Sequence, residues 1–475
     1  MAAVQVIGSV PTNPREWLDY LHSKLLQNRS TVKRYSAYYD GEHQKLAFSQ
    51  ARHLNEFGHV FEKWRDNFCG LIIDSVNERM AIDGFRMTDE PAADADAREI
   101  WQRNHMDAES NAGHLDAMVQ GSAYAVVWAD QDNQPTITLE SAENVVVQYK
   151  PGSRRELEAA AKFYTDDWGR NWATVWFSNR VWTFAAGTFG WANPSQARSV
   201  KNPLGEVPVV PLNNRARLTG DPISDLSTVI PLQDAVNKIV SDALLASEYA
   251  AWPQRYVTGL EIVEDDNGNP VEPFKIAVDK LLQAEDPNAK FGQFEAADLG
   301  NYVKLADMLV QHMASTSRIP FHYFLNGGVV PSGESITAAE AGLIAKTRER
   351  MLHFGEAWEK VMRLCFKVLK DKRAEAYGAE VIWRDPENRT ESQHIDALLK
   401  LKMVGVPTDQ LLSDAGYTPQ QIERFRVMRE EDARIEMELA KKYPMPTQQP
   451  EQVDAQKAAQ KQPQGNAGNQ ARKNT

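Results

Sequence analysis

The sequence predicts an α+β fold in which long helices flank a compact β-rich segment. Short runs of β-branched and aromatic residues lie between residues 123 and 184 and are separated by polar turns. Amphipathic helical patterns stand on both sides of this segment. The longest pattern covers residues 335–370 and would span roughly 50 Å as one helix. An apolar loop with paired glycines, residues 319–335, comes directly before it.

The N-terminal part of the chain is expected to be helical. Asn13 and Pro14 are a typical N-cap and first helical residue. The apolar spacing predicts helices at residues 14–28, 30–39, 58–79, 93–106 and 108–121.

The β-rich segment is expected to contain strands at residues 123–129, 136–139, 145–149, 173–177 and 181–184. Five tryptophans occur in or near it: Trp168, Trp172, Trp176, Trp182 and Trp191. Packing in the core or rim of the sheet explains them better than ligand stacking.

A second helical region follows. Asp221 as N-cap and Pro222 in the first turn predict a helix over residues 222–249. Its polar face would carry Asp225, Asp234, Lys238 and Asp242. A turn-rich module at residues 253–294 interrupts the helices, and a further helix is expected at residues 298–316.

The long helix after the glycine loop has a capping-box pattern from Thr337 to Glu340. One face of it carries Leu343, Arg350, Phe354, Trp358, Val361, Cys365 and Val368. A strand at residues 380–386 is expected to rejoin an earlier sheet. Helices are expected at residues 390–404, 408–415 and 418–443.

Residues 446–475 have few large apolar side chains and are expected to be disordered. We therefore expect their removal to leave the melting temperature nearly unchanged, as measured by scanning calorimetry. A fall of several degrees would show that this segment packs on the folded body.

Composition and motifs argue against an enzyme. The chain carries a net charge of −12 and two isolated cysteines, Cys69 and Cys365. It has no phosphate-binding loop, no zinc-ligand spacing and no nucleophile elbow, so we expect no catalytic residue, metal site or cofactor. No apolar run is long enough for a membrane helix. The acidic balance argues against tight DNA binding, which needs clustered Lys and Arg. An acidic wall would still guide DNA by repulsion, although solubility explains the charge more simply.

Three short motifs, in this order, resemble the portal proteins of tailed bacteriophages, in particular those of actinobacterial phages. They are Tyr38-Tyr39-Asp40-Gly41, Pro253-Gln254-Arg255-Tyr256, and Pro331-Ser332-Gly333-Glu334-Ser335 before Ala338-Ala339-Glu340. The resemblance covers residues 13–443. It implies a non-enzymatic ring, usually of twelve subunits, at the unique capsid vertex, through which double-stranded DNA is packaged and ejected.

The resemblance implies a portal fold with α/β wing and clip parts and a helical stem, tunnel helix and crown. The parts would be a wing (1–221), a first stem helix (222–252), a clip (253–297), a second stem helix (298–318), a tunnel loop (319–335), a long tunnel and wing helix (336–372), a wing return (373–407), a crown (408–445) and a disordered tail (446–475).

The resemblance also implies partners and site residues. The clip would dock the terminase large subunit and later the head–tail adaptor, through Asp265, Asp266, Asn267 and Gly268. The tunnel loop would touch DNA through Asn326, Gly327, Gly328, Val329, Val330, Pro331 and Ser332. Major capsid and scaffold proteins would be further partners, in a virion protein assembled in the host cytoplasm.

Elementary physics supports part of this interpretation. Paired glycines allow backbone angles closed to other residues, and no Lys or Arg lies between Phe321 and Ser335, so the loop would touch DNA without holding it. A plain helix–loop–helix with glycine as a cap is the simpler explanation of the same residues. Two other functions stay open from the sequence: a head–tail adaptor or capsid-assembly scaffold without a DNA channel role, and a soluble enzyme that binds a ligand on the tryptophan-rich sheet.

Overall fold

The computed structural model describes residues 10–42, 66–87, 93–187, 190–218, 220–251, 255–259, 288–293, 298–324, 333–387, 391–417 and 419–442. The chain divides into two units, Met1–Pro419 and Gln420–Thr475. The first unit mixes helices and sheets, which confirms the predicted α+β class. The expected disordered tail lies outside the described residues.

The N-terminal region is helical, as predicted, with a difference in its first element. Helix α1 (Pro14–Tyr39) is continuous, whereas two helices were expected. Neither Pro nor Gly lies near Arg29 to end it, and its buried side chains keep one face along its length. Helices α3 (Phe68–Asn77), α4 (Ala95–Arg103) and α5 (Met106–Gln120) follow. Residues 58–65 of the helix predicted at 58–79 lie outside the described residues.

The β-rich segment forms two antiparallel sheets. Strands β2 (Ser122–Ala129), β3 (Pro135–Ser141) and β10 (Val209–Asn213) form one, in the order β10-β2-β3. The other contains β4 (Val145–Tyr149), β5 (Leu157–Thr165), β6 (Asn171–Phe177), β7 (Arg180–Gly187), β8 (Gly190–Trp191) and β9 (Arg198–Lys201).

Strand β5 was missed because its centre is Ala159-Ala160-Ala161, which has low intrinsic strand preference. The three alanines are fully buried between β4 and β6, so tertiary packing decides their conformation. Strand β10 was missed as well.

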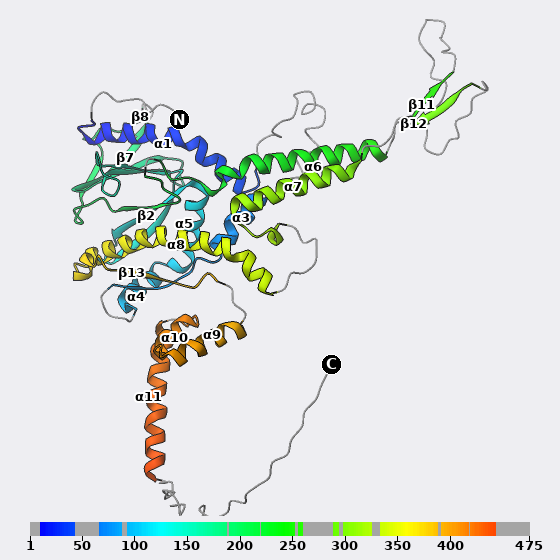
Figure 1. Cartoon of the computed structure of the whole chain (residues 1–475). Coiled ribbons are helices and arrows are strands. Elements are labelled where there is room, and N and C mark those ends of the chain that lie inside the picture. The colour runs from blue at the N-terminus through cyan, green and yellow to red at the C-terminus, as the bar shows by residue number, and fades with distance from the viewer. Residues whose placement is uncertain are drawn as a thin grey trace, which may run out of the picture. The chain divides into compact units, whose positions relative to one another are not determined.

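Helix α1 covers one face of the larger sheet (Figure 1). Its Leu18, Leu21 and Leu25 are buried in one cluster with Phe163 and Phe184 from the strands. The tryptophan prediction is confirmed for Trp176, which is buried, and for Trp182 and Trp191, which are half-buried against the core. Trp168 is different: it is 78% exposed at a hairpin turn, with the Arg170 guanidinium over its ring.

The strand predicted at residues 380–386 is β13 (Glu380–Trp383), and it does return to an earlier part of the chain. Its partner is β1 (Ile82–Arg86), a strand that the sequence analysis did not predict, in a separate two-stranded antiparallel sheet. Ion pairs between Arg86 and Glu380 (2.6 Å) and between Arg384 and Asp83 (2.8 Å) join the two segments.

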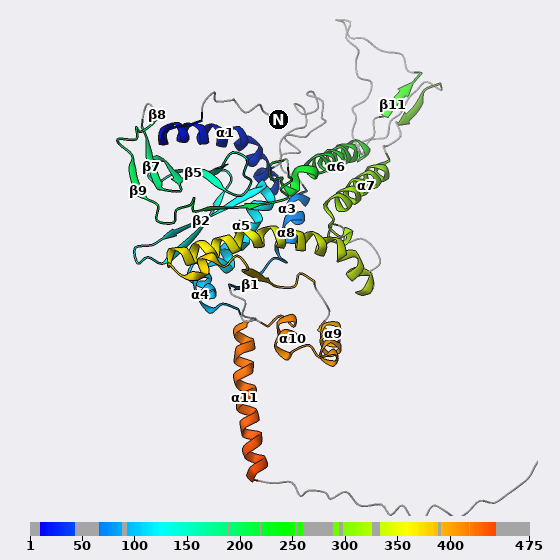
Figure 2. The ribbon, with the colours of Figure 1, turned by 60° about the vertical axis from the view of Figure 1, so that its left-hand side comes forward.

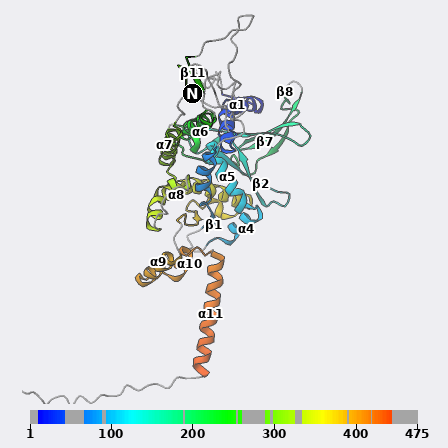
Figure 3. The ribbon, with the colours of Figure 1, turned by 90° about the vertical axis from the view of Figure 1, so that its right-hand side faces the viewer.

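Helices α6 (Ile230–Ala251) and α7 (Leu299–Ser317) lie side by side (Figures 1 and 3). The interrupting module is confirmed in its described part, where β11 (Arg255–Thr258) pairs with β12 (Lys290–Gln293). The predicted start of the first helix was wrong. Asp221 and Pro222 precede a short 3-10 helix, η1 (Asp225–Thr228), which Ser224 caps, and α6 begins only at Ile230.

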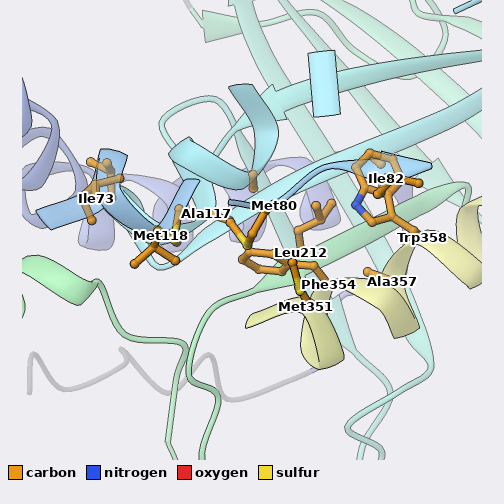
Figure 4. Close-up of a cluster of buried hydrophobic side chains, with 14 of the residues drawn as sticks. Ile73, Met80, Ile82, Ala117, Met118, Leu212, Met351, Phe354, Ala357 and Trp358 are labelled. Atoms are coloured by element: carbon orange, nitrogen blue, oxygen red, sulfur yellow. The ribbon is translucent and has the colours of Figure 1, made fainter. Parts of the chain in front are cut away.

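Helix α8 (Gly333–Val368) confirms the long helix and packs against β10 and against β2, which lies beside it in Figure 2. The helix face for which the sequence analysis gave Leu343 to Val368 is buried from Leu343 to Cys365. Figure 4 shows Met351, Phe354 and Trp358 in the main core beside residues of α3, α5 and β10. Trp358 Nε1 donates to His114 Nε2 at 2.7 Å, and burial lowers the pKa of this histidine to about 3, so it is neutral.

The remaining helices confirm the predictions for the end of the chain. A short 3-10 helix, η3 (Lys372–Glu375), precedes β13, and α9 (Glu391–Val404) and α10 (Thr408–Asp414) complete the first unit. Helix α11 (Pro419–Lys442) follows, and its residues 420–442 are the described part of the second unit.

Candidate functional site

The predicted site residues of the loop and of the clip are not among the described ones. Residues 325–332 contain the whole predicted set Asn326, Gly327, Gly328, Val329, Val330, Pro331 and Ser332, and residues 260–287 contain Asp265, Asp266, Asn267 and Gly268. The structure does place both ends of the glycine loop. These ends and the side chains that hold them are the candidate site.

The first end of the loop follows a sharp change of chain direction. Helix α7 ends at Ser317, and the φ of its C-cap residue Arg318, 60°, is left-handed. Ile319 is buried, and the 3-10 helix η2 (Phe321–Tyr323) follows. Phe324 is buried and its ring lies 5.5 Å from the ring of Phe68, at the start of α3.

Three polar side chains connect this end of the loop with the other. Arg79 Nη2 donates to Tyr323 Oη at 2.7 Å and to Glu340 Oε1 at 3.3 Å. Tyr323 Oη donates to the same Glu340 Oε1 at 3.1 Å. Burial raises the pKa of the Tyr323 phenol, so the hydroxyl keeps the proton that it donates. We call Arg79, Tyr323 and Glu340 the polar triad.

The predicted capping box was therefore wrong. Helix α8 begins at Gly333, so Thr337 and Glu340 lie inside it. Glu340 pairs with Arg79, which follows α3, instead of with the backbone at the helix end. A local sequence pattern does not reveal this distant partner.

A second buried group of charges lies further along α8. Asp225 is 1% exposed in its side chain and pairs with Arg350 at 2.9 Å and Lys346 at 3.1 Å. Asn214 donates to the same carboxylate at 3.0 Å. Lys346 Nζ also donates to the Ser317 carbonyl at 3.3 Å, which joins α8 to the end of α7.

These contacts decide the charge state of the group. Burial by itself raises the pKa of Asp225, but Lys346, Arg350 and Asn214 outweigh it and hold that pKa at about 2. Burial lowers the pKa of the Lys346 ammonium despite the nearby carboxylate. Arg350 is thus the more secure partner, because a guanidinium does not lose its proton in proteins.

The sequence contains one indication of this buried group of charges. Arg350 falls on the apolar face of its helix, which indicates a buried cation that needs a partner. Asp225 was assigned to a solvated polar face because the helix was expected to include it, and this assignment was wrong.

A hollow of about 500 Å³ lies between the end of α7 and the start of α8. Its walls combine Ala314, Ile319, Pro320 and Phe321 with the small residues Ala339 and Gly342 of α8. The candidate site thus has a largely apolar hollow near buried ion pairs, which together hold the end of α7 against the start of α8.

The part of the chain that the structure describes contains neither a candidate metal site nor a candidate membrane-spanning helix. Those residues contain no group of three or more His, Cys, Asp or Glu side chains placed to hold a metal ion. None of the described helices combines the length and apolar character needed to cross a membrane.

Comparison with known proteins connects this architecture to one family. A family model described as "Phage portal protein, SPP1 Gp6-like" matches residues 18–434. That range runs from α1 into α11 and includes the whole candidate site.

Two curated relatives carry the same description. A protein of Mycobacterium phage L5 named "Portal protein" is 30% identical over 435 residues, which is 85% of this chain and 86% of the relative. A protein of Mycobacterium phage D29 with the same name is 31% identical over 398 residues, covering 78% and 79% of the two chains.

Proposed function

The chain belongs to the SPP1 Gp6-like family of phage portal proteins, and we propose how its described parts serve that role. Proteins of this family are structural rather than enzymatic, and family membership implies assembly into a capsid-associated ring. The phage portal role is the function of this chain. The ring would stand at one capsid vertex, with double-stranded DNA entering and leaving through its axis.

The observation that carries the proposal is the family match over residues 18–434, together with the helix–ribbon–helix–loop–helix order within it. In this proposal α6 and α7 form the stem, and the β11–β12 ribbon belongs to the clip. The tunnel loop, predicted at residues 319–335, would end where α8 begins at Gly333, and α8 would connect that loop to the wing.

The remaining parts take their proposed roles from the same order. The two sheets of the β-rich segment, together with α1, β1 and β13, would form the wing. Helices α10 and α11 would belong to the crown. These assignments follow the boundaries expected from the sequence, with the first stem helix beginning at Ile230.

The proposed partners divide between the two ends of the stem. The clip, including Asp265, Asp266, Asn267 and Gly268, would dock the terminase large subunit and afterwards the head–tail adaptor. Major capsid and scaffold proteins would contact the wing during assembly in the host cytoplasm, and the finished ring would remain in the virion.

The other two functions considered from the sequence are not favoured. Both relatives are named portal proteins, not adaptors or scaffolds. The tryptophan-rich sheet uses most of its tryptophans for packing, so a ligand site there has no support from the described side chains.

The ring is tested by imaging. We expect negative-stain electron micrographs of the purified protein, alone or with its scaffold, to show closed rings of twelve subunits with a central hole. Particles no larger than dimers under both conditions would contradict the proposed assembly.

A further inference from the structure

We propose that the polar triad of Arg79, Tyr323 and Glu340 is an anchor that fixes both ends of the tunnel loop to each other and to the core through α3. The consequence for DNA rests on the proposed function of that loop. The anchoring itself rests only on described contacts, so the two can be tested separately.

The geometry makes Tyr323 a bridge between two charges. Its hydroxyl accepts from Arg79 Nη2 at 2.7 Å and donates to Glu340 Oε1 at 3.1 Å. The cation and the carboxylate also meet directly at 3.3 Å. Hydrogen bonds to charged groups are among the stronger ones in proteins, and each member of the triad makes two.

The burial of the triad makes these bonds costly to break. The side chains of Arg79 and Glu340 are 8% and 9% exposed, so salt and water screen them little. Removing one member would leave a buried charge with fewer partners, which costs more than the lost bond itself.

The triad connects segments that are far apart in the chain. Tyr323 stands before residues 325–332 and Glu340 stands after them, so their bond closes the loop at its base. Arg79 comes from a position more than 240 residues earlier. It follows α3, whose Ile72, Ile73 and Val76 are buried in the main core.

Further contacts orient the members of the triad and fix each end of the loop separately. Arg79 Nη1 donates to the Ser75 carbonyl at 3.2 Å, which orients the guanidinium from within α3. Phe324 packs on Phe68 and fixes the first end. Glu340 adds the second end, because it lies within α8 two turns after the helix begins.

An anchor of this kind has a mechanical consequence. A loop whose ends are fixed samples fewer positions than one whose flanking helix can fray. When DNA moves past the loop, the load passes to the core through the triad instead of unwinding the first turns of α8.

Tyr323→Phe tests the anchor because it removes one hydroxyl and keeps the ring. In assembled rings of the full chain, we expect amide hydrogen exchange at residues 321–324 and 334–340 to be about tenfold faster. Ring formation should be unchanged. Glu340→Gln should have a similar effect, because the amide keeps the shape of the side chain but loses its charge.

Tyr377→Phe is the matched control. Tyr377 is 77% exposed and its ring lies by Arg363, a contact that Phe retains, so exchange at the loop ends should not change. Unchanged exchange in both Tyr323→Phe and Glu340→Gln would overturn the proposal. Failure of Tyr323→Phe to form rings would also overturn it, because the hydroxyl would then serve assembly.

The DNA readout separates the anchor from the proposed function. Tyr323→Phe phage should retain less packaged DNA than the Tyr377→Phe control, measured as DNA per filled capsid. Faster exchange with normal DNA retention would support the anchor and count against a role of the loop in holding DNA.

Discussion

Asp225→Asn is expected to lower the free energy of unfolding by about 3–5 kcal/mol. The substitution keeps the shape of the side chain but removes the buried carboxylate from Arg350 and Lys346, which are 2% and 7% exposed. Arg350 then keeps only its ion pair with Glu349, whose side chain is 47% exposed. Lys346 can lose its proton in response, but Arg350 cannot. Urea denaturation followed by tryptophan fluorescence would measure the change.

The control for this substitution is Asp242→Asn. Asp242 is half-buried on α6 and pairs with Lys238 one turn earlier. A pair of this kind contributes about 0.3–0.5 kcal/mol, so the urea midpoint should barely move. Equal losses of unfolding free energy in the two variants would show that the buried ion pairs of Asp225 stabilise the fold no more than the pair on α6.

The same carboxylate makes the folded state sensitive to acid. The pKa of Asp225 is about 2 in the folded protein, against about 3.9 in an unfolded chain. Its stabilising contribution is therefore complete above about pH 5 and is lost as the pH falls through 4 toward 2. Asp225→Asn should remove this part of the acid dependence, which unfolding curves at several pH values would show.

Substituting Val329→Asp together with Val330→Asp is expected to leave ring assembly intact and to reduce DNA retention at least about tenfold. Each subunit would place two carboxylates in the proposed channel, where low-dielectric walls strengthen their repulsion of phosphate. A repulsion of about 1.4 kcal/mol is enough for a factor of ten. Packaged DNA per capsid is the measurement, with electron microscopy to count rings.

Val329→Thr together with Val330→Thr is the matched control, because it changes polarity at constant shape and charge. These phage should package DNA almost normally. If the aspartate variant forms no rings, the loop is a packing element between subunits and not a channel surface. If it forms rings and packages normally, the proposed contact with DNA is wrong.

The long elements were predictable because each one repeats a local pattern many times. The buried face of α8 from Leu343 to Cys365 follows from helical spacing alone. The continuity of α1 and the late start of α6 did not follow. Caps and breaks depend on one or two residues: Ser224 caps the short helix η1 locally, and Asp225 is held by Arg350, 125 positions later.

The candidate site, too, was predictable from the sequence only in part. The sequence marked the glycine loop and its neighbours as unusual, but the predicted loop and clip residues lie outside the described structure and their roles stay predictions. The polar triad was not predicted. A Glu in the first turns of a helix and an Arg after another helix are both ordinary, and only their meeting at 3.3 Å distinguishes them.

By itself, the sequence determined the α+β class, the order of helix, ribbon, helix, loop and long helix, and the resemblance that the family match confirmed. These properties depend on local residue patterns and on their order along the chain, and a sequence contains both. Only the tertiary structure decided which charges are buried together and that both loop ends meet at Arg79. Those pairings join residues more than 100 positions apart, and their attraction is strengthened by the low dielectric of the interior, which no local pattern reports.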